Sequence, residues 1–383
     1  MILRAGILYD GTLESPKRNV DVVIEHGRIA AVRAAEGDSD LAAACVTPGL
    51  VNAHVHLEAS GEPDLFTMVQ TTMPNERLLK AVANARKSLR AGVTTVRDLG
   101  SSNAIAQSLR DAIDAGTIPG PRMRAAGNVL CMTGGHGWPI GREIVSPWDA
   151  RTAVREQLKA GADCIKVIAT GGVLTKGAVP GNEQLCPDEL AFAIDEAHRH
   201  GLRTAAHAIG AAGIKSALRA NVDSIEHGML IDEEGVALLK ERGAYLVPTL
   251  AAAACILEHL EDGTQPGYVV EKARKIGEVM EENLRRAVAA GVRIAGGSDA
   301  GTPYNYHERY AYEVELMHRV LGMTPQQALH AATAVAAELV GIHRGRVAPG
   351  EPADVLLLER DAGADVRALR EPVMVLKGGE VIA

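Results

Sequence analysis

The segment GADCIKVIA (161–169) shows the layout that decides the fold: a helix-ending glycine, a short apolar run and a ligand-type side chain. GLRTAAHA (201–208), NVDSIEHG (221–228) and GVRIAGGSD (291–299) repeat this layout. Glycine and asparagine accept the left-handed backbone that closes a helix, so each apolar run is expected to form a strand. Histidines scattered through a core would show no such phase. The ligand-type residues are Lys166, His207, His227 and Asp299, which follow the glycine or asparagine by 5, 6, 6 and 8 residues.

Strands alternate with helices along most of the chain. Eight strands interleaved with helices over roughly 300 residues are the signature of a (β/α)8 barrel of the TIM type, in the α/β class. A doubly wound open sheet is the competing architecture, but it would not bring ligand-type residues from the first, fourth, fifth, sixth and eighth strands to one point. The strands are expected around residues 50–56, 93–98, 123–130, 163–169, 202–207, 222–227, 244–249 and 292–297.

The two ends of the chain differ from its middle. Residues 1–47 and 345–383 contain short alternating runs separated by turn residues, which are typical of antiparallel strands. The simplest arrangement is a small β-sandwich domain built from both termini, with the barrel inserted between them at residues 48–344.

A His-x-His pair lies in PGLVNAHVH (48–56), at the end of the first expected strand. Residues i and i+2 of a strand share a face, so His54 and His56 can point into the barrel mouth together and hold one metal ion. Alone, such a pair could equally be structural. Joined to the histidines and the carboxylate that end later strands, it completes a set of four imidazoles and one carboxylate, which suits zinc or a similar divalent ion.

Lys166 distinguishes between mechanisms. An ammonium cannot bind a cation, but a buried lysine is readily deprotonated and is then a nucleophile. Reaction with carbon dioxide would give a carbamate, a carboxylate on a long arm that can bridge two metals. A Schiff-base lysine and a structural ion pair are the alternatives. Schiff-base chemistry has no need of the His-x-His pair. Arg97 and Asp98 end the second strand, where an ion pair and a substrate contact are both open.

Composition excludes several partners. The net charge of −8, with both signs interspersed, argues against nucleic acid and anionic membranes, and aromatic residues at 3% offer no platform for stacking bases. No apolar stretch reaches the roughly 20 residues of a membrane span, and MILRAGILYDG (1–11) breaks into charge too early for a secretory segment. Five cysteines without a Cys-x-x-Cys pair predict buried, reduced thiols in the cytoplasm. The expected partner is a small-molecule substrate.

These motifs together resemble the amidohydrolase superfamily over essentially the whole chain. The resemblance is carried by PGLVNAHVH (48–56), by Lys166, His207 and His227 on their strands, and by SDAG (298–301). TGGHG (133–137) and KVIATGG (166–172) are similar to the branch of prolidase-like and Xaa-Arg-type dipeptidases and imidazolonepropionase-related proteins. The resemblance implies that His54, His56 and Asp299 bind a first metal, that His207 and His227 bind a second, and that carboxylated Lys166 bridges them. It also suggests, by analogy, a homo-oligomer.

The implied activity is hydrolysis of an amide bond, of a dipeptide or an N-acyl amino acid, by a metal-bridged hydroxide. Asp299 is expected to accept the proton of the water and pass it to the leaving amine, and His136 to stabilise the oxyanion. Gly171, Gly172 and His307 are the candidate substrate contacts.

Other activities use similar equipment. Hydrolysis of cyclic amides, lactones or organophosphates remains open, and a Schiff-base lyase using Lys166 is a more remote possibility. Deaminases of the superfamily typically hold one metal, lack the bridging lysine and often carry a glutamate three residues after the histidine of strand five, where this chain has Gly210. Some dipeptidases of this branch use a tyrosine just after the histidine of strand six, where this chain has Met229 and Leu230. The dipeptide specificity therefore does not transfer directly.

Overall fold

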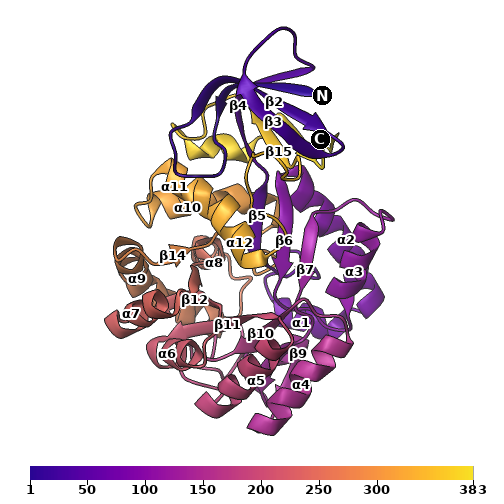
Figure 1. Ribbon diagram of the computed structural model, residues 1–383. Helices are drawn as coiled ribbons and strands as arrows, with labels where there is room; N and C mark the ends of the chain where they lie inside the picture. Colours follow the sequence, from indigo (N-terminus) through magenta and orange to yellow (C-terminus); the bar gives the residue numbers. More distant parts are fainter. Residues whose placement is uncertain (383) are drawn as a thin grey trace.

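A computed structural model describes residues 1–382 of the chain, and a parallel barrel occupies its middle (Figure 1). The barrel strands pair in parallel within two sheets, β5-β6-β7 and β10 to β14. Backbone hydrogen bonds link the sheets: Asp163 N donates to Ala125 O at 2.8 Å, and Ala53 N donates to Gly296 O at 2.9 Å. The barrel is therefore of the TIM type. Its strands are β5 (Leu50–Val55), β6 (Val93–Asp98), β7 (Arg122–Ala125), β10 (Cys164–Ile168), β11 (Arg203–Gly210), β12 (Ser224–Leu230), β13 (Tyr245–Val247) and β14 (Arg293–Ile294).

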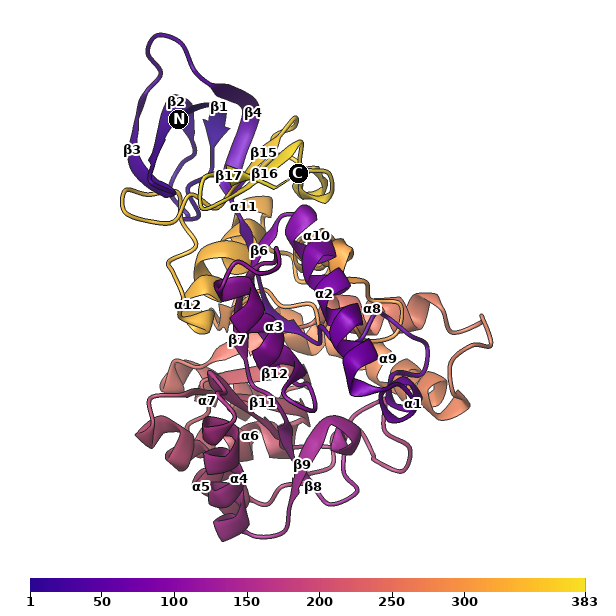
Figure 2. The same cartoon turned by 90° about the vertical axis from the view of Figure 1, so that its right-hand side faces the viewer.

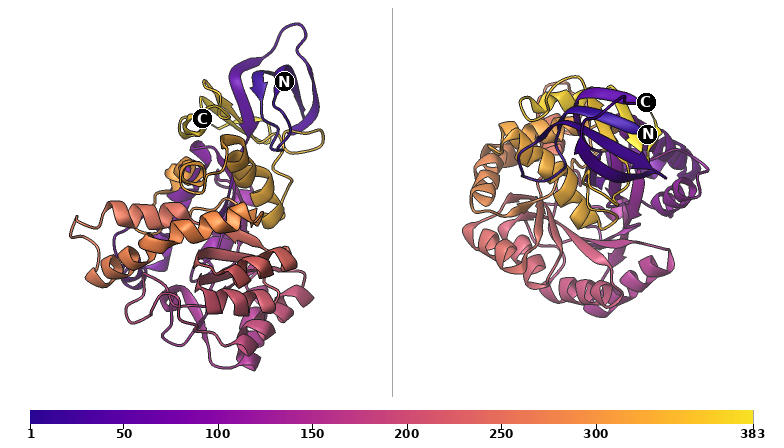
Figure 3. Two further views of the ribbon diagram at one scale, coloured as in Figure 1. Left: turned by 90° about the vertical axis from the view of Figure 1, so that its left-hand side faces the viewer. Right: turned by 45° about the horizontal axis from the view of Figure 1, so that its top comes forward.

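Helices surround these strands (Figure 3). Two of these helices begin with side-chain caps: Ser146 accepts a hydrogen bond from Asp149 N at the start of α4, and Thr324 forms a capping box with Gln327 at the start of α11. The helices are α1 (Leu65–Thr71), α2 (Pro74–Arg90), α3 (Ile105–Asp114), α4 (Pro147–Lys159), α5 (Pro187–Arg199), α6 (Ala211–Arg219), α7 (Glu233–Arg242), α8 (Leu250–Glu258), α9 (Gly267–Ala289), α10 (Tyr310–Arg319), α11 (Pro325–His330) and α12 (Ala336–Val340).

The third expected strand, 123–130, is two strands in the structure. β7 ends at Ala125, and β8 (Val129–Met132) leaves the line of β7 to pair with β10 and with the short β9 (Gly141–Ile144). Gly127 lies between them with φ +71°, a conformation that breaks an extended strand and favours glycine. The sequence prediction was wrong here because one apolar run spans a turn.

The terminal strands form one seven-stranded sheet in the order β17-β16-β15-β4-β1-β2-β3 (Figure 2). Its apolar residues from both termini, among them Leu3, Val22 and Leu357, share one core separate from that of the barrel, as in a small β-sandwich. The pairing of β1 with β4 is parallel, so the expectation of antiparallel strands was wrong for this pair. The strands are β1 (Ile2–Leu8), β2 (Lys17–Glu25), β3 (Arg28–Ala34), β4 (Leu41–Pro48), β15 (Val355–Leu358), β16 (Met374–Lys377) and β17 (Glu380–Val381).

Gly49 connects the terminal sheet to the barrel. It follows β4 directly and precedes β5, and a Cβ at this position would lie 2.2 Å from Thr94 Oγ1. The chain thus crosses between the two cores without a linker. The domain division after residues 47 and 344 is consistent with this crossing and stays our proposal.

Two expectations drawn from composition can be compared with the structure. Among the described residues, no helix is both long and apolar enough to cross a bilayer. Cys45, Cys131, Cys164 and Cys255 are buried, as expected, whereas Cys186 is exposed at the start of α5. The expectation of buried thiols was therefore wrong for Cys186.

Candidate metal centre

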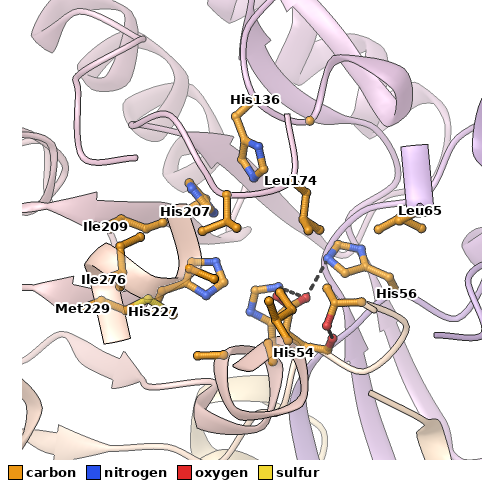
Figure 4. Close-up of a pocket in the computed structure, with 18 of the residues that line it drawn as sticks. His54, His56, Leu65, His136, Leu174, His207, Ile209, His227, Met229 and Ile276 are labelled. Carbon is orange, nitrogen blue, oxygen red and sulfur yellow. Dashed lines mark hydrogen bonds and ion pairs between the residues drawn. The ribbon is translucent and has the colours of Figure 1, made fainter. Parts of the chain in front are cut away.

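The ligand-type side chains gather at the carboxyl ends of the barrel strands, away from the terminal sheet (Figures 1 and 4). They line a single cavity together with apolar residues of the surrounding loops and helices. Two of the strand-end residues, His227 and Asp299, have left-handed backbones, with φ of +73° and +60°. Such conformations are costly for residues other than glycine, and they concentrate at functional sites. The cavity is lined by all six predicted ligands: His54, His56, Lys166, His207, His227 and Asp299.

His54, His56 and Asp299 form the tightest part of the cluster. One ligand atom from each lies within 4.8 Å of the other two. Asp299 Oδ1 lies 3.1 Å from His56 Nε2 and 3.4 Å from His54 Nε2 (Figure 4). This oxygen is buried and accepts no hydrogen bond. A buried carboxylate oxygen without a donor is costly unless a cation satisfies it, so the three side chains fit a divalent ion.

Buried partners orient both imidazoles of this group. His54 Nδ1 lies 2.9 Å from Glu226 Oε2, and His56 Nδ1 lies 2.8 Å from the carbonyl oxygen of Gly100. When each Nδ1 carries the proton, each Nε2 presents its lone pair to the shared site. This is the usual arrangement around metal-binding histidines, in which the second ring nitrogen is held by a carboxylate or a carbonyl.

The sequence left two roles open for Arg97, an ion pair and a substrate contact, and its contacts decide between them. It is buried, its Nη2 donates to Glu226 Oε1 at 2.9 Å, and its Nε donates to the carbonyl of Ala53 at 2.7 Å. Arg97 therefore forms the ion pair and does not face the cavity. Glu226 in turn connects this pair to His54, and Ser224 adds a further hydrogen bond to Glu226 at 2.6 Å.

Sequence reasoning missed Glu226, although SIEHG (224–228) contains it next to His227. Adjacent residues of a regular strand face opposite sides, so only one of the two was expected to serve the site. The left-handed backbone of His227 breaks this alternation. Both side chains consequently serve the same end of the barrel.

His207 and His227 form a looser group beside the first. Their ring centroids lie 4.6 Å apart, and the ring of His227 lies 5.4 Å from that of His54. His227 Nδ1 contacts Thr249 Oγ1 at 2.7 Å, which leaves its Nε2 free for a metal. His207 Nε2 lies 3.4 Å from the carbonyl of Gly171.

Lys166 lies beside the first group and lines the same cavity as the second. The side chain is buried, and its Nζ lies 3.4 Å from His54 Nε2. Burial lowers the pKa of Lys166 to about 8, because the charged ammonium loses its solvation. A neutral amine is therefore accessible near neutral pH.

For His56, burial alone would lower the pKa, but the carboxylate of Asp299 outweighs it and raises the pKa. Burial sets the charge of the other imidazoles. It lowers the pKa of His227 to about 4, and it lowers the pKa of His54 and of His207 well below the ordinary value. For Asp299, burial alone would raise the pKa, but the neighbouring imidazoles of His54 and His56 outweigh it and lower the pKa. Neutral imidazoles and an ionised carboxylate are the forms that bind metal ions.

His136 reaches the same cavity from the loop after β8 (Figure 4). Its ring centroid lies 4.4 Å from that of His207, and burial lowers its pKa to about 3, which keeps the imidazole neutral. Its Nδ1 lies 2.9 Å from Thr175 Oγ1, and that oxygen accepts a hydrogen bond from Gly137 N at 3.4 Å. The Thr175 hydroxyl can then donate to Nδ1, which places the ring proton on Nε2.

The three residues predicted to contact substrate, Gly171, Gly172 and His307, contact other parts of the chain. A Cβ at Gly172 would lie 2.4 Å from His136 Nε2, and a Cβ at Gly171 would lie 2.3 Å from the carbonyl oxygen of Val179. His307 is buried and its Nε2 lies 2.7 Å from the carbonyl of Ala59. None of the three is among the residues that line the cavity. Their role toward substrate stays a prediction.

Comparison with known proteins places this site in a family. Residues 45–382 match the model of the amidohydrolase family. Ochratoxinase from Aspergillus niger is 32% identical over 99% of this chain and 86% of its own length. A Xaa-Pro dipeptidase crystallised with methionine in its active site superposes with a TM-score of 0.92 at 31% identity, over 99% of this chain and 98% of that one. Imidazolonepropionase from Mycolicibacterium smegmatis is 24% identical over 95% of this chain and 91% of its own.

The chain belongs to the amidohydrolase family, in the branch related to prolidases and imidazolonepropionase. It is a hydrolase that acts on C–N bonds, and the family and its neighbours support metal-dependent cleavage of an amide. Members of the superfamily generally use divalent metals, and the group of His54, His56 and Asp299 is compatible with one. The resemblance expected from the sequence is thereby confirmed.

Proposed function

We propose that this enzyme holds two divalent ions and cleaves the amide bond of an N-acyl amino acid or a dipeptide. One observation carries the proposal. Asp299 Oδ1 is buried without a hydrogen-bond donor, at the point where His54 and His56 converge and beside the second pair of imidazoles. A site built for substrate alone would have no reason to leave this oxygen unsatisfied.

The chain offers ligands in two groups. His54, His56 and Asp299 would hold one ion, and His207 and His227 the other. The neutral amine of Lys166 would add carbon dioxide, forming a C–N bond and releasing a proton, and the resulting carbamate would supply one oxygen to each group. Nitrogen and oxygen ligands of this kind suit zinc, the metal that we propose. When bound, such ions acidify a water molecule and polarise a carbonyl group.

Two side chains would handle the proton and the developing charge. Asp299 would accept a proton from the attacking water and pass it to the leaving amine. An amine that does not receive this proton is a poor leaving group. His136, with its proton on Nε2, would donate a hydrogen bond to the oxygen that becomes negative in the tetrahedral intermediate. Thr175 would hold the ring in this tautomer.

The substrate class rests on relatives and on the cavity. The similar structures include one described as a prolidase in complex with N-methylphosphonate-L-proline, and the similar proteins include ochratoxinase. Of the two substrate classes, the N-acyl amino acid fits the cavity better, because among the described residues no carboxylate other than that of Asp299 lines it to bind the ammonium of a dipeptide. A homo-oligomer and a cytoplasmic location stay predictions.

Metal stoichiometry and turnover test this proposal together. Metal-free protein is reloaded with zinc in bicarbonate buffer, and bound metal per chain is measured by elemental analysis while a library of N-acyl amino acids and dipeptides is screened. We expect two ions per chain at full activity, and a carbamate carbon signal in the NMR spectrum after loading with 13C-bicarbonate. Full turnover with one ion per chain, or without the carbamate signal, would contradict the binuclear proposal.

A further inference from the structure

The wall of the cavity opposite the candidate ligands is apolar. It is built by α8 and α9, with α1 and the loop after β10 closing the sides. Figure 4 shows Leu65, Leu174 and Ile276 near the cluster of histidine side chains. On α9 the lining residues are Ala273, Ile276, Gly277 and Met280, which recur at helical spacing and so form one continuous face.

This face is long enough for a sizeable group. From the first to the last of its lining residues, α9 advances about 10 Å along its axis, at roughly 1.5 Å per residue. Ala252 and Ala253 of α8 and Ala273 of α9 have short side chains and leave room in this part of the wall. At Gly277 a Cβ would lie 3.1 Å from Leu257 Cδ1, so α8 and α9 pack closely there. The alanines therefore offer an apolar surface against which a substrate group can pack.

The described lining contains no charged side chain beyond the candidate ligands. Outside that set, only His136 and Thr302 carry polar side-chain groups, and the hydroxyl of Thr302 donates to the backbone oxygen of Asp299 at 2.7 Å. An ionised group placed against this wall would lose its hydration without gaining a partner, which is strongly unfavourable.

Lys272 of α9 could supply a positive charge to pair with an ionised substrate group, but its own contacts hold the ammonium away from the cavity lining. Its Nζ donates to the carbonyl of Thr175 at 2.7 Å and lies 5.1 Å from the ring centroid of Tyr268. Tyr268 in turn donates to the carbonyl of Leu174 at 3.0 Å. Both side chains thus fasten α9 to the loop that carries Thr175, and Lys272 is not among the lining residues.

We infer that the substrate carries an apolar, uncharged group on one side of the scissile amide, and that this group packs along α8 and α9. This inference rests on the proposed amide hydrolysis and specifies its substrate class. The neutral part would be selected by burial against the helices, while the polar reacting bond would face the metal centre. Substrates with an ionised group in that place would be rejected.

Two matched substrate series test the inference. On the acyl side, N-hexanoyl-leucine is compared with N-glutaryl-leucine, whose acyl chain has similar length but ends in a carboxylate. On the amine side, N-acetyl-leucine is compared with N-acetyl-aspartate. In at least one series the apolar substrate should have a kcat/KM higher by about 10- to 100-fold, because unfavourable burial of a charge adds to the loss of apolar contact.

A charge introduced on α9 should weaken or abolish this preference. Ile276→Lys places an ammonium on the lining face, whereas Val279→Lys, the matched control, places it on a part of the same helix that is 44% exposed. We expect Ile276→Lys to improve turnover of the charged substrate. The ratio of kcat/KM for the apolar substrate to kcat/KM for its charged counterpart should then fall at least about tenfold. Met280→Lys is the second variant, in case Ile276→Lys melts at a much lower temperature than the control.

A binding measurement separates this inference from the proposed function. Calorimetry on the metal-free protein should show that N-hexanoyl-leucine or N-acetyl-leucine binds with a negative heat-capacity change, and that its charged counterpart binds more weakly. Turnover of all four substrates without preference would overturn the inference and keep amide hydrolysis. Selective binding without turnover by zinc-loaded enzyme would refute the proposed hydrolysis and keep the apolar site.

Discussion

The two halves of the candidate metal centre are held in different ways. His54, His56 and Asp299 converge within 4.8 Å, and beneath them Glu226 and Arg97 form a buried ion pair. His207 and His227 lie side by side, but their polar partners are a backbone carbonyl and a threonine hydroxyl, with no charged group among them. The first half is thus built to hold a cation before one arrives. Among the described residues, the second half has no anionic ligand of its own, and the proposed carboxylation of Lys166 would supply one.

This difference predicts unequal dependence on Lys166. Lys166→Ala should remove the ion from the second half, leave one ion per chain and lower turnover by about 10⁴-fold or more, since several kcal/mol of charge stabilisation are lost. Elemental analysis and kcat measure both effects. Lys240→Ala, at an exposed position, is the control. Two bound ions and near-normal turnover in Lys166→Ala would contradict the bridging role. Neither half of the metal centre would then depend on Lys166.

Asp299 should matter more for chemistry than for holding metal. In Asp299→Asn the two imidazoles and the amide oxygen remain, so most of the metal should stay bound while kcat falls by about 10²- to 10⁴-fold, the range of a lost proton shuttle. Asp21→Asn, at a buried position of the terminal sheet, controls for loss of a buried carboxylate. A variant that keeps normal kcat would exclude Asp299 as the proton carrier.

The ion pair of Arg97 and Glu226 should contribute to the affinity of the first half of the metal centre for its ion. Glu226→Gln removes the charge that orients His54, and we expect the affinity of the tighter ion to fall by about 10- to 100-fold. Competition with a chelator measures this affinity. Asp354→Asn breaks a comparable pair with Arg122 beside the terminal sheet and should leave it unchanged. Equal losses in the two variants would mean that Glu226 acts through overall stability.

The smallest effect is expected at the second half. Thr249→Val removes the hydroxyl that contacts His227 Nδ1 and should weaken the second ion by about tenfold, at the low end for such partners. Thr249→Ser keeps the hydroxyl and should retain the affinity of the original protein. If both variants lose the same affinity, the methyl group and not the hydrogen bond positions His227.

Much of the site could be predicted because parallel strands end at a common edge. A nearly constant distance from a helix-ending residue pointed to Lys166, His207 and His227 as candidates, and the two-residue period of a strand pointed to His54 and His56. The same reasoning failed where local geometry breaks the period. Gly127 separates β7 from β8, and the left-handed backbone of His227 breaks the alternation that would place Glu226 and His227 on opposite faces.

The alternation of strands and helices and the candidate ligands could be read from the sequence, because periodicity, turn residues and spacing are local properties of a chain. The family followed from the resemblance of its motifs. Which charges meet, and what faces the cavity, depends on the three-dimensional fold. Arg97 and Glu226 are 129 residues apart, and the apolar wall combines α1, α8, α9 and a distant loop. Such contacts depend on how the barrel brings separate segments together, and no pattern within one segment specifies them.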